Sequence, residues 1–104
     1  MDDREQEAAT RLAELRGQID AIDLEILERL NHRADLAQQI GRLKNGVAYR
    51  AEREAQVLRR AADGNRGPMS NEGVVRVFRE IMSACLALER PLTVAYLGPQ
   101  GTFS

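Results

Sequence analysis

The sequence predicts an all-α protein with one very long, one short and one medium helix, arranged in an intertwined helical homodimer. Leu, Ile, Ala, Glu and Arg dominate its 104 residues, and this composition favours helices. Apolar residues also recur at seven-residue spacing over the first forty positions, which is typical of a long helix that packs along a partner.

The first predicted helix covers residues 3–43. This stretch has no proline, and its only glycines are Gly17 and Gly41, so a single uninterrupted helix is the simplest interpretation. At 1.5 Å per residue it would be about 60 Å long. Asn45 and Gly46 are expected to end it, with Gly46 as a left-handed cap.

Two rows of apolar residues run along this helix. Their members are Leu12, Ile19, Ile26 and Ile40 in one row, and Leu15, Ile22, Leu36 and Leu43 in the other. A compact monomer of this size spans only roughly 30 Å, so much of the helix must extend beyond its own domain. We therefore expect it to pack against a second chain.

Two further helices are predicted. A short one covers residues 52–62 and stops near Gly64, before a turn at 65–68. Ser70 or Asn71 can cap the third helix, which Pro91 ends near Arg90. The apolar face of the third helix consists of Val74, Phe78, Ile81, Cys85 and Leu88.

The last residues differ in character from the rest. Residues 92–97 favour a β-strand and lead into a turn that contains Gly98, Pro99 and Gly101. We expect a domain at 1–91, followed at 92–104 by a linker and the first strand and loop of a second, truncated domain.

Composition argues against several classes of protein. Sixteen acidic and fifteen basic residues nearly cancel, so no nucleic-acid partner is expected. The chain shows neither a signal-peptide pattern nor a stretch of membrane-spanning length. One cysteine and one histidine provide too few ligands for a zinc site, and no metal or cofactor is expected. These features fit a reducing cytoplasm.

Charged residues interrupt the apolar stripe. Arg33 falls in the row of Ile26 and Ile40, where a buried unpaired cation would be costly. Lys44 lies eleven residues later, almost in line along the helix and about 16 Å away, so the two cations can bracket a small dianion. Alternatively, such side chains extend into solvent or pair with acids on neighbouring helices.

Arg16 lies in the same seven-residue row as Lys44. It precedes Arg33 by seventeen residues, or about 25 Å of helix, which is too far for both arginines of one chain to hold one small ligand. If Arg16 acts at that ligand, it must come from the second chain. Lys44 is the only lysine, and its compact ammonium differs chemically from the guanidinium fork of arginine.

Three more charged residues occupy helix ends. Arg53 and Glu54 open the second helix, and Glu89 lies eleven residues after Phe78 on the same face of the third. They are either candidate ligand-binding groups or ordinary helix-end charges, Glu89 then being a solvated residue shortly before a helix-ending proline.

Three sequence runs together resemble the all-helical chorismate mutases. They are LRGQIDAIDLEILERLNHRADLAQQIGRLK, YRAEREAQVL and FREIMSACLALE. The ending TVAYLGPQGTFS looks like the first strand and loop of a prephenate dehydratase domain. The resemblance covers essentially the whole chain, and it implies the order of domains found in the bifunctional mutase/dehydratase enzymes.

This resemblance implies that chorismate is rearranged to prephenate, in phenylalanine and tyrosine biosynthesis, without a cofactor. It makes Arg16 the arginine of the opposite protomer and Arg33 a further group that grips a substrate carboxylate. Lys44 corresponds to the lysine that hydrogen-bonds the ether oxygen of the breaking bond. Arg53 corresponds to another binding arginine, and Glu54 to the acid that holds the ring hydroxyl.

At three further positions the residue departs from the best-known pattern. Glu89 stands where many members have glutamine, the second donor to the ether oxygen. Arg50 replaces an aspartate that can assist with the hydroxyl, and Cys85 replaces a serine that can meet a carboxylate. A non-catalytic dimerisation module, or a regulatory domain that has lost catalysis, is the alternative function.

Overall fold

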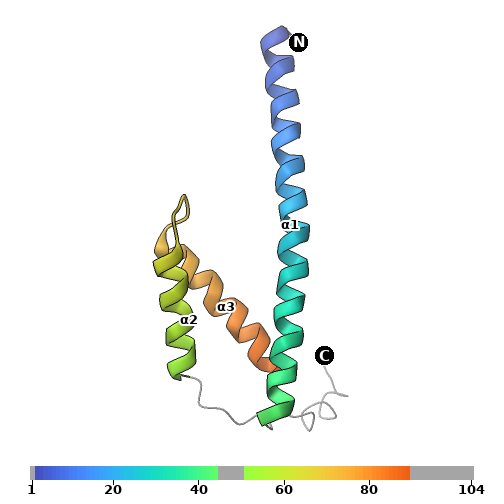
Figure 1. The fold of residues 1–104 in the computed structure, drawn as a ribbon. Coiled ribbons are helices and arrows are strands. Elements are labelled where there is room, and N and C mark those ends of the chain that lie inside the picture. Colours follow the sequence, from blue (N-terminus) through green and yellow to red (C-terminus); the bar gives the residue numbers. More distant parts are fainter. Residues whose placement is uncertain (1, 45–50, 90–104) are drawn as a thin grey trace, which may run out of the picture. The chain divides into compact units, whose positions relative to one another are not determined.

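A computed structural model describes residues 2–44 and 51–89. It contains three helices, α1 (Asp3–Lys44), α2 (Ala51–Gly64) and α3 (Asn71–Glu89), and no strand within those two ranges (Figure 1). The predicted all-α fold with a very long, a short and a medium helix is confirmed. The expected helix end at Asn45 and Gly46, and the expected strand and loop at 92–104, lie outside the described residues.

The chain divides into two units at the junction of residues 32 and 33, within α1. The first unit is the amino-terminal part of α1. Asp2 and Glu5 begin this helix with a reciprocal capping pair, in which the Glu5 amide donates to the Asp2 carboxylate at 2.8 Å and the Asp2 amide donates to the Glu5 carboxylate at 3.0 Å. These bonds satisfy amides that an α-helix leaves without partners in its first turn.

In the second unit, α2 and α3 form an antiparallel pair. The side chain of Asn65 holds their connection with two hydrogen bonds. Its Nδ2 donates to the Met69 carbonyl at 2.8 Å, and its Oδ1 accepts from the Gly67 backbone amide at 3.1 Å. Gly67 has a φ of 76°, which glycine adopts without steric strain. The Ser70 hydroxyl then accepts from the Gly73 amide at 3.0 Å, confirming Ser70 as a cap of α3.

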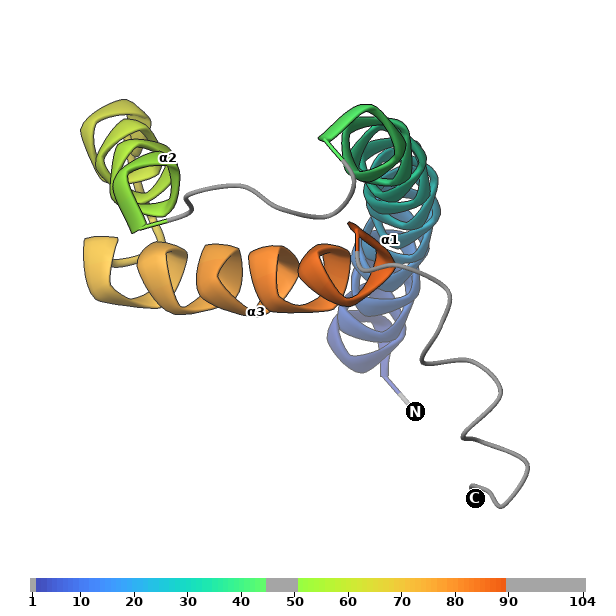
Figure 2. The same ribbon diagram turned by 90° about the horizontal axis from the view of Figure 1, so that it is seen from below.

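The predicted apolar face of α3 is only partly covered. Val74, Phe78 and Ile81 are half-buried and Cys85 is buried, whereas Leu88 is 43% exposed. Figure 2 shows the reason, since α2 lies along the amino-terminal half of α3 and not along its final turns.

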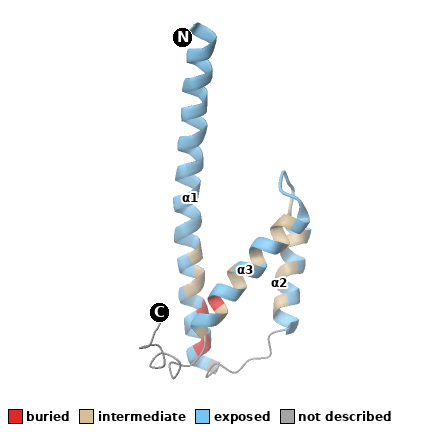
Figure 3. Ribbon diagram, turned by 180° about the vertical axis from the view of Figure 1, so that it is seen from behind, coloured by how far each residue is buried: buried red, intermediate tan, exposed pale blue. Residues whose placement is uncertain are grey.

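The last turns of α3 instead meet the carboxyl-terminal part of α1. Gly41 of α1 lies against the backbone of Glu89, and one turn earlier on each helix Ala37 and Cys85 are 6% and 5% exposed. Figure 3 shows these buried positions where the two helices meet. Small residues at i and i+4 on α1 allow this close approach.

The apolar stripe of α1 is exposed in the single chain. All eight predicted stripe residues are between 40% and 83% exposed, and Leu24 and Leu27 add to the exposed apolar surface of the helix. None of the described helices is both long enough and apolar enough to cross a membrane. The homodimer stays a prediction.

Candidate active site

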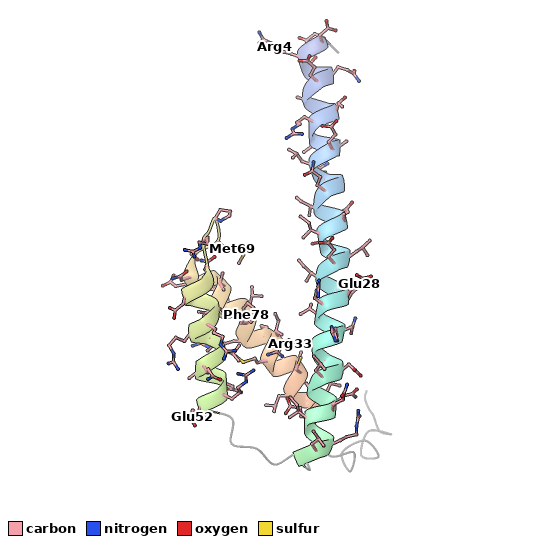
Figure 4. All side chains as sticks on the ribbon, viewed as in Figure 1. Arg4, Glu28, Arg33, Glu52, Met69 and Phe78 are labelled. Atoms are coloured by element: carbon pink, nitrogen blue, oxygen red, sulfur yellow. The ribbon has the colours of Figure 1, made fainter. Side chains whose placement is uncertain are left out.

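Arg33 begins the part of α1 that belongs to the second unit. Its side chain is half-buried, although the residues around it on this helix are mostly exposed. Figure 4 shows it leaving α1 on the side where α3 lies. Arg33 is therefore less accessible to solvent than most of its neighbours on α1.

Lys44 and Glu89 occupy the ends of two helices that meet. Lys44 is the last residue of α1. Glu89 is the last residue of α3, and it is half-buried. Gly41, one turn before Lys44, packs against the Glu89 backbone. The fold thus brings together the two helix ends that carry the predicted donors, although they are 45 residues apart in the sequence.

Cys85 lies one turn before Glu89 and is 5% exposed. Its thiol forms no disulfide, and Cys85 precedes by one turn the residue of α3 that contacts Gly41 of α1. A substrate contact by this residue stays a prediction.

Arg53 and Glu54 lie in the first turn of α2. Arg53 is exposed and donates from Nη1 to Oε1 of Gln56 at 2.7 Å, a local bond one turn along the same helix. Glu54 is half-buried. Because α2 and α3 diverge away from their connecting loop, this first turn lies apart from the end of α3 in the single chain (Figure 1).

Two predicted residues are not among the described residues of the second unit. Arg16 is exposed on the amino-terminal part of α1, which belongs to the first unit, and Arg50 lies outside the described residues. The second unit alone therefore carries Arg33, Lys44, Cys85 and Glu89 on two contacting helices.

The close contact at Gly41 was not predicted from the sequence. Gly41 was interpreted only as a tolerated glycine within a long helix, whereas the structure places it at a backbone contact with α3. A glycine inside a strongly helical segment, with no turn beside it, is itself a signal of close packing. The sequence does not say which element approaches it.

The two helix ends that meet in the second unit carry Lys44 and Glu89, and hydrogen-bond donors held at fixed positions can stabilise the charge that develops in a reaction. The family model for chorismate mutase type II matches residues 15–90. The chain belongs to this family, and it is a chorismate mutase domain of the isomerase class. The family resemblance noted in the sequence is confirmed.

Two relatives and one solved structure also support membership of the chorismate mutase family. The chain is 62% identical over 90 residues to a bifunctional chorismate mutase/prephenate dehydratase of Neisseria gonorrhoeae, covering 86% of this chain and 25% of the relative. It is 51% identical over 104 residues to the protein of the same description from Stutzerimonas stutzeri, covering 92% of this chain and 28% of the relative. The structure of chorismate mutase (form II) from Thermus thermophilus matches with a TM-score of 0.72 and 38% identity, over 76% of this chain and 93% of that one.

The chain thus spans only about a quarter of the length of the bifunctional relatives it matches. It covers nearly all of the Thermus thermophilus chain, which is described as a chorismate mutase. The similarity to that structure therefore extends over nearly the whole Thermus thermophilus chain.

Proposed function

We propose that this domain converts chorismate to prephenate, as a step in phenylalanine and tyrosine biosynthesis, by electrostatic and conformational catalysis. One observation carries the proposal: in a chain of this family, α1 ends at Lys44 where it packs against the end of α3 at Glu89. The relatives from Neisseria gonorrhoeae and Stutzerimonas stutzeri, described as chorismate mutase/prephenate dehydratases, support the choice of substrate.

The reaction is an intramolecular rearrangement in which one carbon–oxygen bond breaks while one carbon–carbon bond forms. It needs no nucleophile, no proton transfer and no redox group. It needs chorismate held in its reactive diaxial-like conformer, since a preorganised geometry removes an entropic part of the barrier. It also needs positive charge or hydrogen-bond donors near the ether oxygen, which gains negative charge as its bond breaks.

The charged residues divide between these two tasks. Arg16 and Arg33 bind the carboxylates of the substrate and hold its conformation, each with a planar fork that suits a carboxylate. Lys44 and protonated Glu89 donate to the ether oxygen. Arg53 adds a binding contact and Glu54 accepts from the ring hydroxyl. Contacts from Arg50 and Cys85 complete the proposed binding set.

The proposed assembly is a homodimer. Support comes from the apolar stripe of α1, whose members are 40–83% exposed in a single chain. Burying one such side chain contributes about 1.5–3 kcal/mol, so leaving eight of them in water is unfavourable. A second copy offers the same stripe at the same seven-residue spacing, as a symmetric pairing of two long helices requires.

Arg16 acts across the dimer in this proposal. In a continuous helix, seventeen residues separate it from Arg33 by about 25 Å, which exceeds the reach of two side chains around one small molecule. If the partner α1 runs antiparallel, its Arg16 comes close to Arg33. Each dimer then has two composite sites, and neither chain has a complete one.

The proposal also covers the compartment and the domain boundary of the protein. The proposed compartment is the cytoplasm, where the single cysteine, Cys85, stays reduced. The proposed domain boundary lies between residues 91 and 92, and residues 92–104 begin a dehydratase domain in a longer protein. The 104-residue chain is not expected to dehydrate prephenate.

The proposal is tested by incubating the purified chain with chorismate and a metal chelator while following the loss of chorismate's ultraviolet absorbance. We expect enzyme-dependent loss of chorismate in the presence of the chelator, because no step uses a metal. Prephenate should be the sole product, because the reaction is an intramolecular rearrangement. A folded, dimeric sample that leaves chorismate at its spontaneous rate would contradict the proposal and favour a dimerisation or regulatory module instead.

A further inference from the structure

Gly41 lies where α1 and α3 bring their backbones together. A Cβ atom built on Gly41 would lie 2.7 Å from the carbonyl oxygen of Glu89, 2.8 Å from its Cα and 3.0 Å from its carbonyl carbon. These are backbone atoms, which cannot turn aside as the tip of a long side chain can. Any larger residue at position 41 must therefore shift one of the two helices.

The requirement at Gly41 is for space and not for an unusual backbone conformation. Among the described glycines only Gly67 has a positive φ, so the conformation at Gly41 is open to any residue. Alanine is a better helix former than glycine in the interior of a helix. A glycine here is thus unfavourable for α1 by itself and is explained by the contact with α3.

The contact also fixes the two ends that carry the proposed donors. Lys44 follows Gly41 by one turn, and Glu89 is the residue that Gly41 touches. Two donors to one oxygen must both come within about 2.7–3.1 Å of the same point. Their helices therefore have to lie at one particular separation.

Resting on the proposed roles of Lys44 and Glu89, we propose that Gly41 is a positioning residue. Its missing side chain sets the distance between the end of α1 and the end of α3, so that both donors reach the ether oxygen together. A methyl group at position 41 displaces Glu89 by about 1 Å, and a misplacement of that size can lower a rate about 100-fold.

Packing alone also gives a reason for this glycine, since Ala37 and Cys85 are buried one turn away. The test therefore compares Gly41→Ala with Gly64→Ala in the full 104-residue dimer. Gly64 lies at the end of α2, and a Cβ atom added there would meet no atom within 4 Å, so this control adds the same methyl group without a contact. We expect both variants to form helical dimers, and kcat to fall about 100-fold for Gly41→Ala alone, with KM little changed.

The decisive measurement repeats Gly41→Ala in a Glu89→Ala background. If Gly41 acts by placing Glu89, the second substitution adds almost no further loss of kcat/KM, because the donor it misplaces is already gone. An equal fold-loss in both backgrounds, or a Gly41→Ala chain that no longer folds, overturns the inference, since the close approach would then serve packing.

The pH profile gives an independent readout. We expect kcat/KM of the wild-type protein to fall as pH rises, because a carboxylate cannot donate to the ether oxygen, and we expect Gly41→Ala to lose this dependence together with the donor. Arg42 and Lys44 on the last turn of α1 and Arg90 next in the chain are the nearby charged groups in the sequence, and none is changed by the variant. A wild-type chain inactive with chorismate would refute the proposed function itself, whereas an intact pH dependence in an impaired Gly41→Ala protein refutes only the inference about Gly41.

Discussion

At the scale of single residues, the proposed mechanism requires Glu89 to donate a hydrogen bond to the ether oxygen. A carboxylic acid donates a hydrogen bond only while it is protonated. Once ionised it places negative charge beside an oxygen that is itself becoming negative, which raises the barrier. A glutamine at this position would donate a hydrogen bond at every pH.

Glu89→Gln should therefore flatten the pH profile. We expect kcat/KM of the wild-type protein to fall as pH rises, because a carboxylate cannot donate, whereas the amide of the variant donates at every pH. The measurement is kcat/KM for chorismate from weakly acidic to weakly alkaline pH in both proteins. An active variant with the wild-type profile would remove Glu89 from the mechanism.

Lys44→Ala should reduce turnover strongly. Loss of one preorganised donor to a developing oxyanion lowers kcat about 10²–10³-fold in other enzymes, or about 2.7–4 kcal/mol. Arg42→Ala is a matched control, because it also removes a cation from the last turn of α1 but lies outside the proposed site. Comparable losses of kcat in the two variants would show that general positive charge, not a directed donor, is what matters.

Residue types and spacing in the sequence predict most of the candidate site, but not which groups meet. The position of Arg33 in an apolar row left two interpretations open, a side chain turned toward the packed face or one extending into solvent, and the residue is half-buried. The meeting of the ends of α1 and α3 depends on the crossing of the two helices at Gly41. A crossing is set by tertiary packing, which local periodicity does not encode.

At the scale of helices, α1 combines two kinds of function. Its carboxyl-terminal part carries Arg33 and Lys44, and its amino-terminal part carries Arg16. The apolar stripe runs through both parts and stays exposed in the single chain. Continuity of this helix therefore links the proposed association of two chains to the completeness of each site.

A charge on the stripe should separate the chains. Ile19→Glu removes about 1.5–3 kcal/mol of apolar burial from each copy and also buries a carboxylate without a partner. Because two copies are affected, we expect the dissociation constant of the dimer to rise more than about 100-fold, with loss of activity at assay concentrations. Sedimentation equilibrium gives the constant directly.

Leu24→Glu is the control for this change. Leu24 is 65% exposed on the same helix but falls outside both rows of the stripe, so an added charge there should remain in water. If both variants stay dimeric, or if both dissociate equally, the stripe is not the surface that joins the chains.

The helices themselves were readily predicted. The boundaries expected at 3–43 and 52–62 lie within two residues of α1 and α2, because proline, glycine and capping residues act locally on the backbone. The burial of α3 was harder to predict, since Leu88 shares its apolar face yet stays 43% exposed. Periodicity identifies a face, but only the neighbouring element decides how much of it is covered.

At the scale of the whole molecule, the proposed activity depends on formation of the dimer. Described by itself, the second unit holds Arg33, Lys44 and Glu89, whereas Arg16 belongs to the first. If Arg16 completes the site of the partner chain, dissociation abolishes activity even when every helix remains folded. Activity should then depend on protein concentration in the range of the dimer dissociation constant.

The most direct test of the composite site is complementation between two inactive variants. Arg16→Ala and Arg33→Ala should each be nearly inactive, because each removes a carboxylate contact from both sites of its dimer. After equal amounts are unfolded and refolded together, half of the dimers are mixed, and each mixed dimer has one site with both arginines. Recovery of about a quarter of wild-type activity is predicted for a symmetric dimer. If mass spectrometry shows that mixed dimers have formed and activity is still absent, Arg16 does not act across the chains and the account is wrong.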